Sequence, residues 1–276
     1  MKSYPKKLKT LLKTEIDPAF TRRAELIFIE TENSQPQSVL DLGCGRGFYL
    51  KALTFFPKIK EIVGVDVNQS YLDVAKTNIN DKRVSLKKMD INQLTKLKKK
   101  FDLIILTEVL EHIPDDQELL LKIKKILKPK GRLIITVPNS NFPFCWDPLN
   151  YLLMRLFNTH INKDIWWLAG IWADHERLYS AKQLKQLINR TGYRILKNEP
   201  IVRYCWPFSH FLLYGLGKNL VEKLSLKGFD RFNFEQEKNT GRLLAKLMAW
   251  PNKQMRKIFN EKSSVSANHF LLLANK

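Results

Sequence analysis

Short apolar runs alternate with amphipathic stretches along the first half of the chain. Runs at 38–42, 61–67, 83–90, 101–107 and 131–137 are short and largely apolar, which predicts strands. Helical spacing predicts helices over 46–55, 68–78 and 115–127, and Pro129-Lys130-Gly131 is expected to close the last of these. Strand and helix alternating in this way predict a doubly wound α/β fold, a parallel sheet with helices on both faces.

The second half of the chain continues this pattern with two interruptions. A helix capped by Ser180, a turn at Gly192 and a further strand are expected, and "NHFLLLANK" predicts a last strand at 268–276. The sequence therefore divides into a core at 34–199 plus 267–276, an N-terminal helical lead-in at 1–33, an aromatic lid at 142–179 and a basic, aromatic helical insertion at 200–266. We expect the lead-in to cover the site.

Composition narrows the cellular setting but leaves the partner open. Three scattered cysteines without a Cys-x-x-Cys pair favour a reducing cytoplasm, and the first residues do not resemble a signal peptide. No apolar stretch reaches the roughly 18 residues that span a bilayer. The net charge of +20 favours an anionic partner, a membrane surface or RNA, although lysines scattered along the chain also fit a general compositional bias.

A glycine-rich loop follows the first predicted strand. Gly43, Gly45 and Gly47 let the backbone approach a ligand at the start of the next helix, whose free N–H groups attract an anion. The spacing is G-x-G-x-G and differs from the G-x-G-x-x-G of dinucleotide sites. Asp66 ends the second strand, where a carboxylate accepts both hydroxyls of a ribose, and Asp90 ends the third, where it accepts from an exocyclic amine. Turn or cap formation is the alternative for either residue alone.

Five strings in order carry a family resemblance. "VLDLGCGRG", "VGVD", "MDI", "FDLIILTEVLEHIPD" and "LKPKGRLIITVPN", over residues 36–140, resemble the class I S-adenosylmethionine-dependent methyltransferases. "DHERLYSAKQLKQLINRTGYRI" is similar to the branch that includes ubiquinone-type O-methyltransferases. The resemblance does not extend into the two insertions.

The resemblance implies a Rossmann-like sheet of seven strands whose last strand is antiparallel. It also implies that S-adenosylmethionine binds at the strand tips, and not a pyrophosphate. The residues implied to bind the cofactor are Asp41, Gly43, Cys44, Gly45 and Gly47 at the methionine part, Asp66 and Val67 at the ribose, Asp90 and Ile91 at the adenine, and Thr107 and Glu108 at the floor.

Transfer to a hydroxyl requires that the hydroxyl lose its proton, which an acid–base side chain can accept. The candidates are Glu111 and His112, which share a helical face with Glu108, and the distant His175. An E-x-x-E-H segment with a distant histidine resembles the divalent-metal site of small-RNA 2′-O-methyltransferases and related quinone O-methyltransferases. Two further interpretations stay open: that Glu111 and His112 only cap or orient a helix, and that His175 acts as a base without a metal.

The insertions are expected to select the methyl acceptor. Aromatic residues suited to wall an apolar pocket are Phe142, Phe144, Trp146, Tyr151, Phe157, Trp166, Trp167 and Trp172. Aromatic and basic residues at 201–262, among them Lys218, Lys223 and Lys227, fit an anionic membrane surface, single-stranded RNA, or only a solvated helical cap. The favoured acceptor is an apolar or lipid-linked small molecule. The alternatives are RNA and a non-catalytic partner-binding module.

Overall fold

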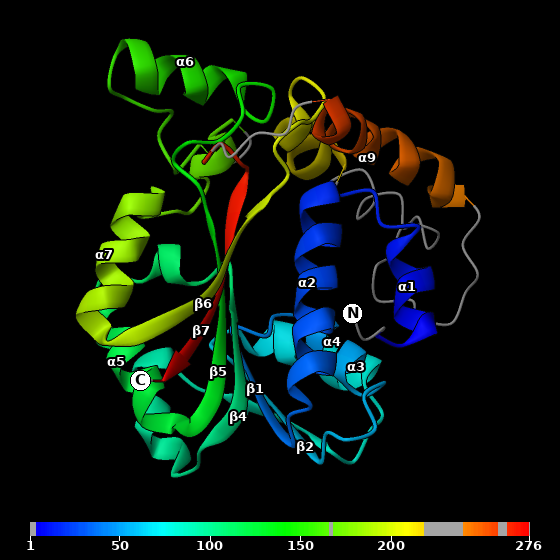
Figure 1. The fold of residues 1–276 in the computed structure, drawn as a ribbon, viewed down its shortest axis with the longest axis vertical. Helices are drawn as coiled ribbons and strands as arrows, with labels where there is room; N and C mark the ends of the chain where they lie inside the picture. Colours follow the sequence, from blue (N-terminus) through cyan, green and yellow to red (C-terminus); the bar gives the residue numbers. More distant parts are fainter. Residues whose placement is uncertain (1–3, 166–167, 218–239, 259–263, 276) are drawn as a thin grey trace.

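The computed structural model of the chain describes residues 4–165, 168–217, 240–258 and 264–275. These residues form one sheet of seven strands in the order β3-β2-β1-β4-β5-β7-β6 (Figure 1). The strands are β1 (Ser38–Leu42), β2 (Glu61–Asp66), β3 (Val84–Lys88), β4 (Phe101–Thr107), β5 (Leu127–Pro138), β6 (Tyr193–Ile201) and β7 (Asn268–Asn275). Strands β1 to β5 are parallel, and β7 runs antiparallel to both β5 and β6. The predicted fold, with its antiparallel last strand, is confirmed.

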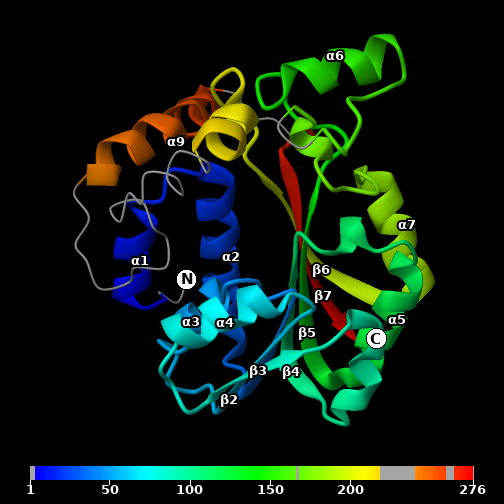
Figure 2. The same cartoon turned by 180° about the vertical axis from the view of Figure 1, so that it is seen from behind.

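Helices cover both faces of the sheet. Among the described residues, the α-helices are α1 (Lys6–Leu12), α2 (Pro18–Ser34), α3 (Phe48–Leu53), α4 (Gln69–Asn78), α5 (Asp116–Ile126), α6 (Pro148–Leu156), α7 (Ala181–Thr191) and α9 (Thr240–Ile258). Figures 1 and 2 show α1 to α4 on one side of the sheet and α5 and α7 on the other. The buried apolar residues form two clusters. Because side chains alternate along a strand, Val39 packs in one cluster and its neighbour Leu40 in the other. The fully buried β1 explains why its sequence shows no polar alternation.

The helix boundaries follow the capping residues that the sequence contains. Asn68 and Asp115 cap α4 and α5 with their side chains, and Ser180 forms a capping box with Gln183 at the start of α7. Gly192 ends α7 in the left-handed conformation, as predicted.

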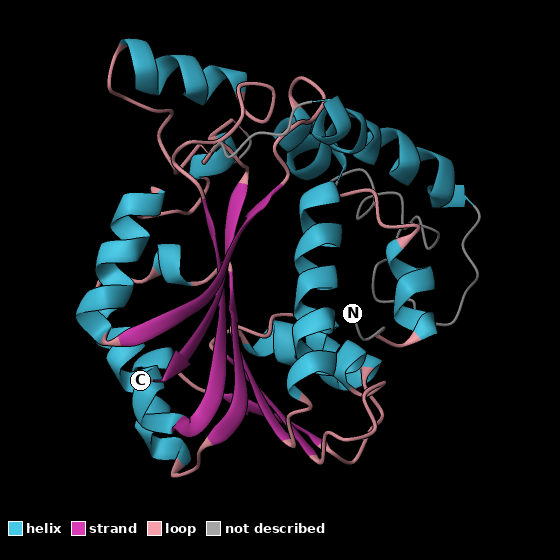
Figure 3. Cartoon of the chain, in the orientation of Figure 1, coloured by secondary structure: helices cyan, strands magenta, loops and turns pink. Residues whose placement is uncertain are grey.

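Figure 3 shows the strands in magenta between helices in cyan. The segment Pro129-Lys130-Gly131 differs from the prediction, because it does not end the helix but lies within β5. Leu127 already pairs with Phe101, and regular pairing resumes at Arg132 opposite Leu103. Residues 128–131 therefore interrupt the regular pairing of β5 with β4. Pro129, which has no N–H group, is consequently not required to donate a hydrogen bond to the neighbouring strand.

Segments from both insertions lie beyond the carboxyl ends of the parallel strands. They include α6, α9, the short helix η3 (Gly170–Trp172) and the π-helical turn η4 (Phe211–Gly217) (Figure 1). Pro251 has no N–H for the Leu247 carbonyl of α9, and Trp206 Nε1 donates to that carbonyl at 2.9 Å instead. Trp166, Trp167, Lys218, Lys223 and Lys227 lie outside the described residues.

The described part of the chain has no helix that is both long and apolar enough to cross a membrane. Cys44, Cys145 and Cys205 are free thiols.

Candidate functional site

The glycine loop connects β1 to α3 at the centre of the sheet. Gly43, Gly45 and Gly47 all have positive φ, at 72°, 51° and 84°, a region that favours glycine. A Cβ on Gly43 would lie 2.5 Å from Val109 Cγ2, whereas one on Gly45 would meet nothing within 4 Å. Gly43 is therefore required for packing. The open space beside Gly45 is where a ligand can approach the backbone.

Asp66 holds this loop in place. Its carboxylate accepts from the Gly45 N–H at 2.8 Å and from the Asn68 N–H at 2.9 Å. Each carboxylate oxygen has a further lone pair for a ligand hydroxyl. Val67, the next residue, is exposed at this edge.

Asp90 and Ile91 lie at the tip of the neighbouring strand β3. Asp90 is exposed and caps the following turn by accepting from the Asn92 N–H, while Ile91 is buried. Both the capping role that the sequence left open for Asp90 and a free acceptor atom are thus present.

Asp41 is the polar group at this edge that lacks a partner. It is fully buried on β1, and neither carboxylate oxygen has a hydrogen-bond partner in the structure. Burial, together with the charge of Asp66, raises the pKa of Asp41 to about 7. A buried carboxylate without a partner fits an ammonium group such as that of the methionine part of S-adenosylmethionine, so these residues are suited to the cofactor.

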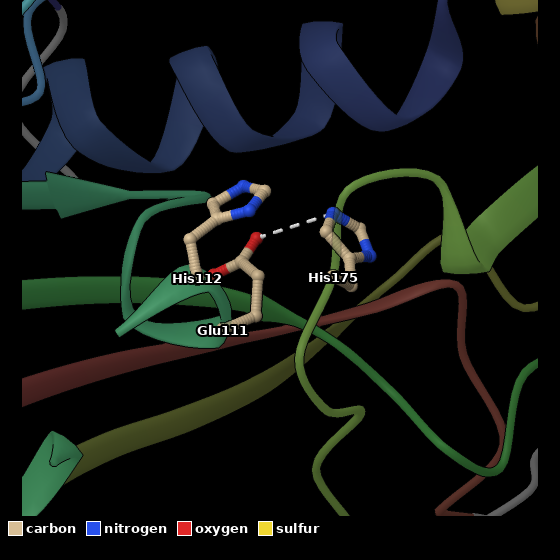
Figure 4. A group of neighbouring side chains, drawn as sticks. All are labelled: Glu111, His112 and His175. Carbon is tan, nitrogen blue, oxygen red and sulfur yellow. Dashed lines mark ion pairs between the residues drawn. The ribbon is translucent and has the colours of Figure 1, made fainter. Parts of the chain in front are cut away.

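A second group of polar side chains lies past the tip of β4. Glu111 and His112 belong to the short helix η2 (Leu110–His112), and His175 comes from the loop after η3. One ligand atom from each residue lies within 4.8 Å of the others, and Figure 4 shows the three side chains converging. The structure thus brings together three of the four residues that the sequence proposed as metal ligands.

Hydrogen bonds between the two loops fix this arrangement. The Glu176 N–H donates to the Glu111 carbonyl at 3.0 Å. His112 Nδ1 lies 2.7 Å from the Asp174 carbonyl, and His175 Nδ1 lies 2.6 Å from the Ile171 carbonyl. Since a carbonyl only accepts, both Nδ1 atoms carry a proton, and in the neutral rings both Nε2 atoms have a free lone pair.

Glu111 is fully buried, and neither of its carboxylate oxygens has a hydrogen-bond partner. Burial and the nearby Glu108 carboxylate raise its pKa well above the ordinary value. Burial and His112 lower the pKa of His175, whose Nε2 lies 3.8 Å from Glu111 Oε1. Both shifts favour the neutral forms, so this contact is not an ion pair between two charged groups. A cation between the two residues would restore the charge of Glu111.

Glu108 does not join this cluster, in contrast to the expectation from the sequence. Its Oε1 forms an ion pair with Arg23 Nη1 at 3.0 Å and accepts from Thr136 Oγ1 at 2.7 Å. Its Oε2 accepts from Asn268 Nδ2 at 2.7 Å. Both carboxylate oxygens of Glu108 thus have partners, and these contacts fix the side chain next to Thr107 at the end of β4.

Arg23 is the site residue that the sequence reasoning missed. Burial opposes its charge, but Glu108, Tyr49, Tyr214 and Asp17 together outweigh that cost, and the pKa of Arg23 is raised. An available signal was its place between Phe20 and Ile27 on the apolar face of α2, where an arginine requires a buried acidic partner. Arg23 positions Glu108 and links the N-terminal helix to the site.

The comparisons with known proteins show the family to which the chain belongs. The family described as "Methyltransferase domain" matches residues 12–198, well over half of the chain. The chain therefore belongs to this family and has the class I fold of S-adenosylmethionine-dependent methyltransferases.

Curated relatives match a shorter stretch. The ubiquinone biosynthesis O-methyltransferase of Coxiella burnetii is 38% identical over 106 residues, which are 38% of this chain and 44% of that protein. An uncharacterized methyltransferase of Schizosaccharomyces pombe is 38% identical over 108 residues, 36% of this chain and 37% of that protein. The chain thus spans less than half the length of these relatives.

Solved structures match over nearly the whole chain. A SAM-dependent methyltransferase from Archaeoglobus fulgidus has a TM-score of 0.53 at 17% identity, covering 92% of this chain and 93% of that one. The methyltransferase domain of bacterial CtHen1-C has a TM-score of 0.52 at 16% identity, covering 96% and 98%. At these identities the likeness shows the fold alone.

Proposed function

We propose that the protein transfers the methyl group of S-adenosylmethionine to a hydroxyl, and that Glu111, His112 and His175 hold a divalent cation beside that hydroxyl. The observation that carries the cation site is the buried, unpartnered Glu111 carboxylate facing two imidazoles whose Nδ1 atoms are bonded to backbone carbonyls. In metal sites, a histidine ligand commonly donates its other ring N–H to a carbonyl or carboxylate, and this hydrogen bond orients the ring. His112 and His175 both make such a bond through Nδ1. Two imidazoles and one carboxylate suit manganese, zinc or iron better than magnesium.

The roles of the chain's own residues follow from their places. Asp41 would pair with the ammonium group of the cofactor, and Asp66 would accept hydrogen bonds from its ribose hydroxyls. The open space beside Gly45 would let the cofactor contact the backbone of the loop. The sulfonium supplies an activated methyl group, and a bound cation would lower the pKa of the acceptor hydroxyl. The acceptor hydroxyl would release its proton to solvent, and its oxygen would form the new bond to the methyl carbon while the bond from that carbon to sulfur breaks and leaves its electrons on sulfur.

A metal-free reaction is the second candidate. The lowered pKa of His175 keeps its ring neutral near neutral pH, and its Nε2 lone pair faces Glu111 and is free to take the acceptor proton. Loss of activity on exhaustive chelation distinguishes the cation from this direct base.

The proposed acceptor is an apolar or lipid-linked small molecule. Phe142 and Trp146 of the lid are buried, and Asp147 ties the lid together by accepting from the Asn150 and Ile171 N–H groups. The curated relative whose name refers to ubiquinone biosynthesis supports a small acceptor with an apolar part. RNA is the competing acceptor, and assays with an apolar phenol and with a small RNA separate the two.

Manganese binding to the purified protein tests the cation site. The wild-type protein should bind Mn²⁺ and unfold at a higher temperature with it, since a ligand that binds only the folded state stabilises that state. Glu111→Gln should lose at least about tenfold in Mn²⁺ affinity, because a neutral amide is a much weaker ligand. Glu118→Gln, an exposed change on α5, should keep wild-type affinity. Equal Mn²⁺ affinity of all three proteins, or its absence in the wild type, would contradict the site.

A further inference from the structure

Two helices beyond the carboxyl ends of the parallel strands expose apolar side chains in regular stripes. On α6 these are Leu149, Leu152 and Leu156, spaced three and four residues apart, and Phe157 follows directly. This spacing places the three leucines on one face of the helix. The face points away from the protein core.

Helix α9 carries the longer stripe. Leu243, Leu247, Trp250 and Ile258 are 78%, 54%, 50% and 69% exposed and follow one another at helical spacing. Arg242, Lys246, Lys253 and Lys257 occupy the adjacent arc of the same helix. Neither α6 nor α9 contains an aspartate or glutamate within its bounds.

Helices α5 and α7 carry no such stripe. Helix α7 buries Leu184, Leu187 and Ile188, and its exposed positions are polar, such as Lys182 and Lys185. Helix α5 likewise buries four apolar residues against the sheet. Figures 1 and 2 show α6 and α9 both lying across the end of the molecule towards which the parallel strands point.

We propose that α6 and α9 form a docking surface that seats the protein on an anionic lipid bilayer. Apolar stripes flanked by cations and free of acidic residues are the pattern of helices that lie in the bilayer interface. Lysine and arginine near such a surface are attracted to anionic lipids. The exposed apolar residues of α9 are mostly aliphatic, which favours lipid over RNA, because bases stack on aromatic rings.

This orientation places the strand tips, and with them the candidate site, on the side of the protein that faces the lipid. The use of the surface rests on the apolar acceptor proposed above, whereas binding to the bilayer itself can be measured without any acceptor. Co-sedimentation with phosphatidylcholine vesicles, with and without phosphatidylglycerol, separates apolar from electrostatic contributions. Titration with S-adenosylhomocysteine reports the cofactor site independently.

The full-length protein should bind vesicles that contain phosphatidylglycerol and bind those of phosphatidylcholine more weakly. Leu243→Glu/Leu247→Glu should lower vesicle binding by about tenfold or more, because two exposed apolar contacts are replaced by charges that anionic lipid repels. Lys246→Glu/Lys253→Glu should remove the preference for anionic vesicles. The matched controls Leu121→Glu on α5 and Lys182→Glu/Lys185→Glu on α7 should bind as the wild type does, and all five proteins should bind S-adenosylhomocysteine equally.

Three results would overturn the docking surface. The first is a wild-type protein that does not sediment with anionic vesicles. The second is equal loss in the α9 variants and in their α5 and α7 controls. The third is a pair of α9 variants that retain vesicle binding but lose binding to a single-stranded RNA. Loss of S-adenosylhomocysteine binding in the wild type would instead count against the proposed function.

Discussion

Two regions of the proposed site are built in different ways. The cofactor edge is the edge of the sheet at the tips of β1 to β3, and the cation cluster past β4 consists of Glu111, His112 and His175. At the cofactor edge, Asp41, the glycine loop and Asp66 come from one continuous stretch, and the Gly45 N–H donates directly to Asp66. In the cluster, Glu111 and His112 meet His175 from a loop more than sixty positions away. The first is set by local backbone geometry, whereas the second depends on an inserted segment being docked correctly.

The two regions also handle buried charge differently. Asp41 and Glu111 are both fully buried carboxylates without partners. Asp41 lies beside glycines and a second carboxylate, which fits a cationic ligand group, while Glu111 faces two imidazoles, which fit a metal ion. A buried carboxylate that lacks a hydrogen-bond partner therefore indicates a different ligand in each of the two regions. The ion pair between Arg23 and Glu108 connects α2 to the end of β4, next to the cation cluster.

Breaking that connection should have the largest effect. Arg23→Met should lower the free energy of unfolding by about 3 kcal/mol, because it leaves the Glu108 carboxylate without its cation. The neighbouring Arg22→Met removes more exposed pairs with Glu25 and Glu199 and should cost less than about 1 kcal/mol. Urea unfolding measures both, and Arg23→Met/Glu108→Gln should recover part of the loss. Equal losses in the two single variants would refute the buried connection.

Removing the carboxylate of the cofactor edge should come next. Asp66→Ala takes away the acceptor of the Gly45 N–H as well as the proposed ribose contacts. Hydrogen bonds to charged groups contribute roughly 1.5 to 3 kcal/mol each, so affinity for S-adenosylhomocysteine should fall about a hundredfold. Asp73→Ala on α4 is the control. Unchanged affinity in Asp66→Ala, measured by calorimetry, would remove the ribose assignment.

Titrating the pH sharpens the role of Asp41. Burial and Asp66 raise its pKa to about 7, so below pH 7 the free protein holds Asp41 protonated. A bound ammonium group favours the ionised form, and binding must then release a proton. Affinity for S-adenosylhomocysteine should therefore fall as pH drops below 7, by at most about tenfold per pH unit, and should level off above it. An Asp41→Asn variant that shows the same pH dependence would contradict this assignment.

The smallest expected effect concerns the helix that follows the His175 loop. Ser180→Ala removes the capping box of α7 and should lower the free energy of unfolding by about 1 kcal/mol. Ser70→Ala on α4 should cost much less, because Asn68 supplies that cap. Binding of S-adenosylhomocysteine should be unaffected by either change. A weaker affinity in Ser180→Ala would show that the two regions are coupled more tightly than the structure indicates.

The sequence predicted the elements whose signals are local. The caps Asn68, Asp115 and Ser180 lie where their helices begin. The antiparallel direction of the last strand, which the family resemblance and not a local signal implied, is confirmed. The strand at Pro129 was missed because pairing with Phe101 outweighs the local preference for a turn.

Long-range partners were harder to predict. The engagement of Glu108 by Arg23, Thr136 and Asn268 joins four distant segments, and no spacing in the sequence reports it. The pairing of His112 and His175 with backbone carbonyls likewise depends on how the loops dock. The roles of these residues in binding and catalysis stay predictions.

Calorimetric titration of the intact protein with S-adenosylhomocysteine tests the cofactor site most directly. The buried Asp41 carboxylate, the open side of Gly45 and the free lone pairs of Asp66 predict binding of one molecule in the micromolar range. A wild-type protein that is folded and yet produces no heat of binding would contradict the central claim, with or without manganese present.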